Sequence, residues 1–258
     1  MHNHNHKPDE WPIFILSLEG DEDRRAPLVS ALSDMGMSAV VLIGVDGRRG
    51  LPAWAEKRVA RQRQHPGLRP LTDGELACAL SHANAYHKIV ENNLPGAIIF
   101  EDDARLDAKF KSFFNARAHM SADMVLLGYG SCWVRRMWKK DIGAGIQLFR
   151  IAVTPVLAHG YCVSHAAALS LIEATTPIRE FADWPCDISK MKVLAAYPRL
   201  AHQNAEDVGY SHLEADRSAE KHKDMLLSPW VRKKRQFRKR LRYSWWTARF
   251  AKLLSLKL

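Results

Sequence analysis

The sequence predicts an α/β fold, and three patterns near its N-terminus are the reason. Residues 11–18 (WPIFILSL) form an apolar run of strand length, and residues 38–45 (SAVVLIGV) form a second one. Between them, residues 24–35 carry apolar side chains at helical spacing until Gly36 ends the pattern. A strand, a helix and a strand in so few residues are typical of the βαβ unit that begins a parallel sheet.

The following segments continue the alternation of helices and strands. Thr72 and Glu75 have the spacing of a capping box, which predicts a helix that starts there and ends near Asn92. A charged surface helix is expected over residues 52–65, and a helix capped by Ser164 is expected over 165–175. Further buried strands are expected at residues 96–100, 124–127, 147–151 and 157–163.

The positive charge is concentrated at the C-terminus. The chain has 258 residues, of which 47% are hydrophobic, so it can bury a sizeable core. Residues 231–258 contain eleven Lys and Arg and no acid, which leaves 27 basic and 28 acidic side chains in the first 230 residues. We therefore expect a nearly neutral domain over residues 11–228 and a basic tail over residues 229–258.

The basic tail has the pattern of an amphipathic helix. Phe237, Leu241 and Trp245 fall on one helical face, and lysines and arginines fill most of the rest. Cationic amphipathic helices with tryptophan bind anionic membranes. The same stripe could instead pack on the domain, and its mixture of basic and aromatic residues also suits nucleic acid.

The N-terminus and the cysteines bear on the cellular location. Residues 1–10, with alternating His and Asn, resemble an affinity tag and leader and are set aside. No run approaches the roughly 18 to 20 apolar residues of a spanning helix, and no apolar signal core is present. The four cysteines are scattered without a CxxC pair. We expect a cytoplasmic protein with reduced thiols.

An acidic triplet follows one of the predicted strands. Glu101, Asp102 and Asp103 come directly after residues 96–100, at the strand end where open α/β sheets bind ligands. Neighbouring carboxylates repel one another unless a cation compensates them. On an extended strand, Glu101 and Asp103 share a face and Asp102 points away, so the pair could hold Mg²⁺ or Mn²⁺. From the residues alone, a solvated acidic turn explains the triplet equally well.

Seven stretches of the sequence, taken in order, resemble glycosyltransferase family 25, which includes bacterial lipooligosaccharide galactosyltransferases and related glucosyltransferases. The stretches are ILSLEGDEDRR (15–25), VDGR (45–48), LTDGELACALSH (71–82), LPGAIIFEDDA (94–104), HGYCVSHAAAL (159–169), ADW (182–184) and YPRLAHQ (197–203). The resemblance implies a GT-A type nucleotide-sugar-binding fold with a Rossmann-like mixed sheet. It also implies a nucleoside-diphosphate sugar as donor, a divalent metal (Mn²⁺ or Mg²⁺) and inversion at the anomeric carbon.

The resemblance further implies which residues form the site. Glu101 and Asp103 would hold the metal. The residues implied on the donor side are Ser17, Leu18, Arg25, Asp46, Glu75, Ser81, His82, Asp102, Gly160, Tyr161 and Gln203. Arg25 suits a phosphate because a guanidinium can bind it through two parallel bonds, whereas Arg24 is expected to be an exposed helix-face residue.

Several of these residues also have structural explanations. Asp46 suits a turn, and Glu75 is explained as the capping-box residue. A lone helix histidine such as His82 is more often a structural group than a ligand, and Tyr161 could belong to the core. By chemistry His202 would be a third metal ligand, but the resemblance supports Gln203.

Inversion by single displacement needs a base that takes the proton of the acceptor hydroxyl. Asp183 lies where the family places an acidic residue after its glycine and aromatic strand, so Asp183 is the expected base. Asp187 is the rival candidate. Either residue could instead be a helix-capping acid.

These expectations define an inverting, metal-dependent glycosyltransferase. It would move a hexose, galactose first and glucose as the alternative, from a UDP-sugar to a lipopolysaccharide or lipooligosaccharide core. Because that acceptor lies at the inner face of the bacterial cytoplasmic membrane, peripheral membrane attachment is favoured for the tail and nucleic acid is not expected.

Two alternatives to the transferase function remain. One is a metal-dependent phosphoester hydrolase, although the further Asp and His clusters of a two-metal site are lacking. The other is a noncatalytic membrane- or nucleic-acid-binding module, which would not explain the acidic strand end.

Overall fold

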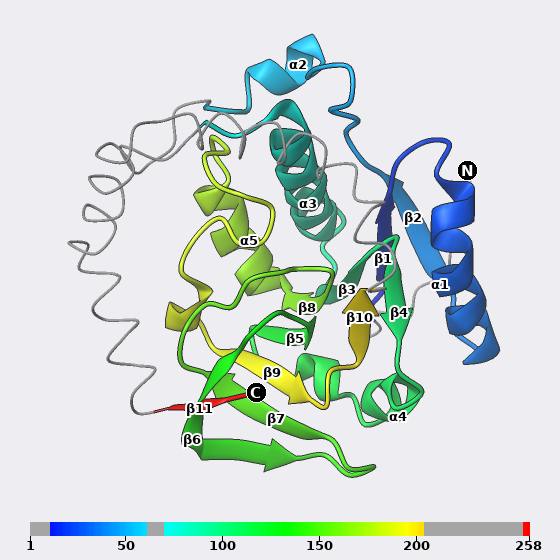
Figure 1. Ribbon diagram of the computed structural model, residues 1–258, viewed down its shortest axis with the longest axis vertical. Coiled ribbons are helices and arrows are strands. Elements are labelled where there is room, and N and C mark those ends of the chain that lie inside the picture. Colours follow the sequence, from blue (N-terminus) through cyan, green and yellow to red (C-terminus); the bar gives the residue numbers. More distant parts are fainter. Residues whose placement is uncertain (1–10, 61–69, 204–254) are drawn as a thin grey trace, which may run out of the picture.

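The computed structural model describes residues 11–60, 70–203 and 255–258, which form a large mixed sheet with helices on both faces (Figure 1). The nine strands lie in the order β11-β6-β7-β9-β5-β8-β3-β1-β2, and β10 and β4 form a separate small sheet. The strands are β1 (Ile13–Ser17), β2 (Ala39–Ile43), β3 (Gly96–Glu101), β4 (Ala104–Leu106), β5 (Met124–Gly128), β6 (Trp133–Asp141), β7 (Gln147–Ile151), β8 (Gly160–Ser164), β9 (Val193–Tyr197), β10 (Ala201–Gln203) and β11 (Ser255–Lys257). The helices are α1 (Glu22–Asp34), α2 (Ala53–Glu56), α3 (Asp73–Glu91), α4 (Phe110–Asn115) and α5 (His165–Ala174), with 3-10 turns η1 (Ala118–Met120) and η2 (Ile188–Lys190).

Two hydrophobic layers cover the two faces of the large sheet. Side chains alternate along β1, so Phe14 and Leu16 belong to one layer and Ile13 and Ile15 to the other. Helices α3 and α5 contribute to the first layer, and α1 and α4 contribute to the second. Both faces of β1 are therefore buried, which explains why its sequence is continuously apolar.

The strand order brings three carboxyl ends to one edge of the sheet. Strands β2, β1 and β3 are parallel neighbours, with Leu16 of β1 paired to Glu101 of β3. Strand β8 lies antiparallel between β3 and β5, whereas β5 and β9 are parallel. The predicted α/β fold with a Rossmann-like mixed sheet is therefore confirmed. Its ligand-binding edge is expected at the ends of β1, β2 and β3.

Helix α3 begins at the predicted capping box. The Thr72 hydroxyl accepts a hydrogen bond from the Glu75 amide (3.2 Å), and the Glu75 carboxylate accepts one from the Thr72 amide (3.0 Å). Both bonds satisfy amides that a helix start would otherwise leave without partners. Ser164 likewise caps α5, as predicted, by accepting from the Ala167 amide at 3.2 Å.

Two predicted elements differ from the structure. The charged helix expected over residues 52–65 is only the short α2, because Val59 instead pairs with Ile178 in an isolated bridge. Residues 61–65 of that prediction lie outside the described residues. The strand expected over residues 157–163 begins only at Gly160, since Leu157 has a positive φ of 71° and cannot continue an extended chain.

The C-terminal tail is described only at its end. The predicted tag over residues 1–10 and most of the predicted amphipathic helix lie outside the described residues. The helix prediction is wrong for the last residues, because β11 pairs antiparallel with β6. The Leu258 amide also donates to the Cys132 carbonyl at 2.8 Å, and Leu258 packs against the layer that contains α3 and α5. Within the described ranges, no helix has both the length and the apolar character to cross a membrane.

A buried histidine joins the second layer to the start of the domain. His119 in η1 is 4% exposed, and its ring stacks on Phe114 with centroids 5.0 Å apart. Its edge contacts Trp11, with centroids 5.5 Å apart. Burial, aided by the charge of Arg117, lowers the pKa of His119 from 6.5 to about 4. The side chain is therefore neutral in the folded protein at physiological pH.

We expect His119 to weaken the fold in mild acid. In the unfolded chain this residue takes up a proton near pH 6.5, but in the folded chain only near pH 4, so folding free energy is lost as the pH falls between these values. The loss is about 3 kcal/mol, from about 1.4 kcal/mol per pH unit. Urea unfolding at several pH values should show that the unfolding free energy falls less between pH 6.5 and about pH 4 in His119→Phe than in the unmodified chain. His87→Gln, which alters a histidine 36% exposed on α3, is the control, and parallel curves for all three proteins would contradict the assignment.

Candidate functional site

The predicted acidic triplet lies at the carboxyl end of β3. Strand β3 ends at Glu101, and a turn follows over Asp102 and Asp103. The end of the parallel neighbour β1 lies beside it, because Leu16 pairs with Glu101. The acidic side chains therefore lie where the fold places a ligand site.

Arg24 joins two of the three carboxylates. Its Nε donates to Asp102 Oδ1 at 2.6 Å, and its Nη2 donates to Asp103 Oδ2 at 2.7 Å. Two expectations are therefore wrong. Arg24 is not an exposed helix-face residue, and Asp102 does not point away from Asp103, because the chain leaves the strand after Glu101 and strand alternation no longer applies.

The charge at this site fits a divalent cation. Three carboxylates and one guanidinium carry two net negative charges, and the side chains of Asp102 and Asp103 are only 10% and 11% exposed. Asp103 Oδ1 is buried without a hydrogen-bond partner. Burial and the charge of Glu101 raise the pKa of Asp103 to about 6, although Arg24 opposes them. An all-oxygen donor set with surplus negative charge is what Mg²⁺ or Mn²⁺ requires, so Asp103 and Glu101 fit the metal that the family implies.

A chain of hydrogen bonds connects α3, β3 and β8. His82 Nε2 lies 3.3 Å from Glu101 Oε1, and His82 Nδ1 lies 2.8 Å from the Tyr161 hydroxyl. The Tyr161 hydroxyl lies 3.0 Å from that of Tyr86. Tyr161 is fully buried, and an edge-to-face contact with Trp184 holds its ring, with centroids 5.3 Å apart. His82 and Tyr161 therefore belong to the site through Glu101.

The two-stranded sheet brings Gln203 to the same carboxylate. Gln203 pairs with Ala104 across β10 and β4, and its Nε2 donates to Glu101 Oε2 at 3.5 Å. His202 pairs with Arg105 in this sheet. The structure thus brings Gln203, rather than His202, to Glu101.

The end of β1 gathers three residues of the predicted nucleotide side. Arg25 Nη1 lies 3.2 Å from Ser17 Oγ and 3.4 Å from the Leu18 carbonyl oxygen. Its other nitrogen, Nη2, forms an ion pair with Glu22 at 2.7 Å. The three predicted residues are adjacent, and their contact with a nucleotide stays a prediction.

Other predicted residues have structural partners. Asp46 accepts hydrogen bonds from the amide and side chain of Arg48, as expected for a turn residue. The Ser81 hydroxyl donates to the Ala77 carbonyl at 2.8 Å and accepts from the Val45 amide at 2.9 Å, so it ties α3 to the end of β2. A Cβ at Gly160 would lie 2.8 Å from that of Ala201, so this position requires glycine for close packing. Glu75 completes the capping box.

The two candidate bases differ in their surroundings. Asp187 caps η2, and its Oδ1 accepts from Thr154 Oγ1 at 2.6 Å and Ser189 Oγ at 2.7 Å. Although partial burial opposes it, these hydrogen bonds lower the pKa of Asp187, which makes it a weaker base. Asp183 lies between Ala182, which lines a pocket, and Trp184, which contacts Tyr161.

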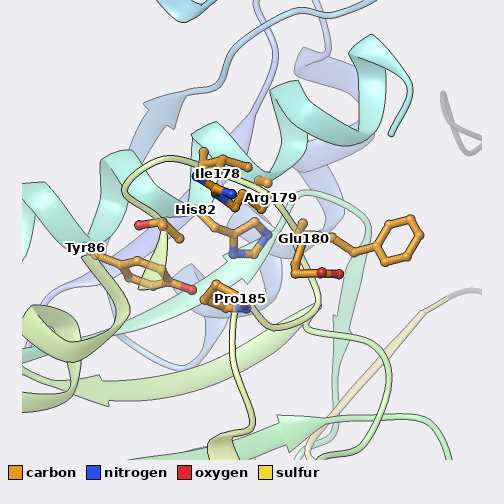
Figure 2. Close-up of a pocket in the computed structure, with 10 residues that line it drawn as sticks. His82, Tyr86, Ile178, Arg179, Glu180 and Pro185 are labelled. Carbon is orange, nitrogen blue, oxygen red and sulfur yellow. The ribbon is translucent and has the colours of Figure 1, made fainter. Parts of the chain in front are cut away.

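That pocket lies beside the hydrogen-bond chain. It is small, partly open to solvent, and formed by α3 and the loop over residues 175–185. Figure 2 shows His82 between Ile178 and Pro185, with Tyr86 on the same helix. The rim carries the charged residues Arg179 and Glu180. The pocket therefore places polar and charged side chains next to His82 and the hydrogen-bond chain.

Sequence reasoning missed three contributors to the site. Arg24 was overlooked because its partners lie 78 and 79 positions away in the sequence. They come together because α1 follows β1 and the acidic turn follows β3, and these two strands are parallel neighbours. Tyr86 was missed as a partner of Tyr161, although it lies four residues after His82 and therefore shares its helical face. Cys78 was also missed, although it lies four residues before His82 and therefore shares the same helical face.

Comparison with known proteins identifies the family. The family model described as "Glycosyltransferase family 25 (LPS biosynthesis protein)" matches residues 10–189. The chain belongs to glycosyltransferase family 25. This confirms the family inferred from the seven stretches.

The relatives include proteins named as galactosyltransferases and proteins named as inactive. Procollagen galactosyltransferase 2 of Mus musculus is 30% identical over 103 residues, which are 38% of this chain and 16% of the relative. "Probable inactive glycosyltransferase 25 family member 3" of Bos taurus is 33% identical over 105 residues, 38% of this chain and 17% of the relative. Procollagen galactosyltransferase 1-A of Xenopus laevis is 28% identical over 184 residues, 66% of this chain and 30% of the relative. The chain thus spans less than a third of the length of these relatives.

Proposed function

We propose that this member of glycosyltransferase family 25 is an inverting, metal-dependent hexosyltransferase that uses a UDP-sugar. The observation that carries the proposal is the acidic cluster of Glu101, Asp102 and Asp103 at the carboxyl end of β3, beside the end of β1. Galactose is the proposed sugar, supported by the names of the relatives, and glucose is the alternative. The family description supports a lipopolysaccharide or lipooligosaccharide core as acceptor.

The donor side follows from the charges at the two strand ends. Asp103 and Glu101 would hold the metal, which neutralises charge on the leaving nucleoside diphosphate when bound. Arg25, fixed by Ser17 and the Leu18 carbonyl, would bind the donor from the end of β1. Arg24 holds Asp102 and Asp103 in place, so their oxygens need little rearrangement when the ion enters.

The acceptor side requires a base across the site. Asp183 is proposed to take the proton of the acceptor hydroxyl as the sugar is transferred. Its place between the pocket wall at Ala182 and the ring contact of Trp184 with Tyr161 supports this role. Asp187 is proposed to be structural, because its Oδ1 already accepts the hydrogen bonds that cap η2.

We also propose peripheral attachment to the anionic inner face of the cytoplasmic membrane. The eleven basic residues of the segment 231–258 support this proposal. Strand β6 supports it too, because β11 at the end of the tail pairs with β6. Met137 and Trp138 on β6 are 97% and 42% exposed, and Arg135, Lys139 and Lys140 beside them are exposed too. Apolar side chains surrounded by basic ones suit an anionic lipid surface.

Binding of UDP should depend on Mn²⁺ and on Asp103. Asp103→Asn keeps the shape but removes one charge that holds the ion, so calorimetry with Mn²⁺ should show UDP affinity at least about tenfold weaker, about 1.4 kcal/mol. Asp34→Asn, an exposed change on α1, is the control and should behave as the unmodified chain. Equal affinity for all three proteins in metal-saturated buffer would contradict the metal assignment.

The two candidate bases can be separated by turnover and stability. Asp183→Asn should still bind the UDP-sugar yet transfer roughly 100 to 10,000-fold more slowly, because a positioned general base has been removed. Asp187→Ala should instead lose about 1 kcal/mol of unfolding free energy with turnover nearly unchanged, because it removes the side-chain oxygen that caps η2. Kinetics and urea unfolding of both variants test this, and the opposite pattern would assign Asp187 as the base.

Membrane attachment should depend on β6 as well as on the tail. In cosedimentation with vesicles that contain anionic lipid, the double variant Met137→Glu and Trp138→Glu should bind several-fold more weakly, because apolar contacts are replaced by repelling charge. Val29→Glu, which changes a residue 41% exposed on α1, is the matched control. Binding should also fall as salt rises. Equal binding by the double variant and the control would exclude β6 from the contact.

A further inference from the structure

We propose that Cys78, His82 and Glu101 form a second cation site, selective for a borderline-soft transition-metal ion such as Zn²⁺. One ligand atom from each residue lies within 4.8 Å of the other two. Cys78 and His82 are four residues apart on α3, so they occupy one face of that helix, and Glu101 reaches them from the end of β3. This inference does not rest on the proposed transfer reaction.

The ring of His82 is oriented for such a site. Its Nδ1 is 2.8 Å from the Tyr161 hydroxyl, which leaves Nε2, at 3.3 Å from Glu101 Oε1, to face the cation. Metal-binding histidines generally use their second nitrogen in this way, because that hydrogen bond fixes both the tautomer and the direction of the ring. The Tyr161 hydroxyl is itself hydrogen-bonded to Tyr86, and Tyr161 is fully buried. The hydrogen bond between His82 and Tyr161 therefore holds the imidazole ring in one orientation.

The donor types distinguish this site from the carboxylate site. A thiolate sulfur, an imidazole nitrogen and a carboxylate oxygen are ligands that Zn²⁺ accepts in tetrahedral sites, whereas Mg²⁺ favours oxygen and neither Mg²⁺ nor Mn²⁺ favours a thiolate. When Zn²⁺ binds, the Cys78 thiol releases one proton to water, and the charges of thiolate and carboxylate then balance those of the ion. Cys78 is partly exposed, so an ion can reach it, and three protein ligands leave a fourth position open.

Sharing of Glu101 gives the second site a consequence. Glu101 is also one of the two residues proposed to hold the donor metal. When the Glu101 carboxylate binds Zn²⁺, it can no longer hold the donor metal together with Asp103. Zn²⁺ in the Cys78 site should therefore oppose binding of UDP with Mn²⁺. The thiol itself lies outside the proposed donor and acceptor residues.

Titration of the reduced full chain with Co²⁺, a spectroscopic substitute for Zn²⁺, tests the site. A thiolate ligand gives a near-ultraviolet charge-transfer band that histidines alone do not give, so the histidines at positions 2, 4 and 6 cannot imitate it. The band should appear in the unmodified chain and in Cys186→Ser, which removes an exposed thiol, and should vanish in Cys78→Ser. Tyr161→Phe should keep the band but weaken Co²⁺ binding about 10 to 100-fold. A band that is absent from the unmodified chain, or that persists in Cys78→Ser, would overturn the proposal.

A second measurement needs no variant. Zn²⁺ should slow alkylation of Cys78, followed by mass spectrometry, and leave alkylation of Cys186 unchanged, whereas Cys132 and Cys162 are buried. Equal alkylation of Cys78 with and without Zn²⁺ would also overturn the site. Neither assay uses a sugar nucleotide, so failure of the proposed transferase function would leave both results unaffected.

Discussion

The central constraint on this structure is the burial of carboxylates at the end of one strand. Asp102 and Asp103 are almost withdrawn from water, beside Glu101, and such a group is costly unless positive charge or hydrogen bonds compensate it. The compensation comes from three directions: Arg24 from α1, His82 from α3 and Gln203 from β10. The acidic cluster therefore fixes how two helices and the small sheet meet around the end of β3.

Helix α3 converts a local sequence signal into the geometry of the site. The capping box fixes its first residue, which fixes the faces on which all later residues lie. Cys78, His82 and Tyr86 then follow at intervals of four toward Glu101 and Tyr161, while Ser81 ties the helix to the end of β2. One local start signal thus aligns groups that interact with two strands distant in the sequence.

Local patterns predicted the elements well, and long-range contacts explain the failures. The strand over residues 147–151 and the start of α3 agree with prediction, because hydrophobic pattern and capping are local. The helix over 52–65 fails because Val59 pairs with Ile178, and β6 was missed because its basic sequence does not alternate. For the site, the strand end was predictable but Arg24 was not, because nothing near Arg24 in sequence identifies partners that lie 78 residues away.

The sheet order relates the proposed membrane contact to the proposed site. Strand β6 lies near one edge of the large sheet, and β3 lies five strands further across it. Neighbouring strands are about 4.8 Å apart, so the two are separated by roughly 24 Å. An acceptor anchored in lipid at β6 would reach the end of β3 only through a hydrophilic chain of that length. The extended sugar core of a glycolipid meets this requirement, whereas a lipid headgroup alone does not, so the two proposals agree only for an acceptor that already carries several sugars.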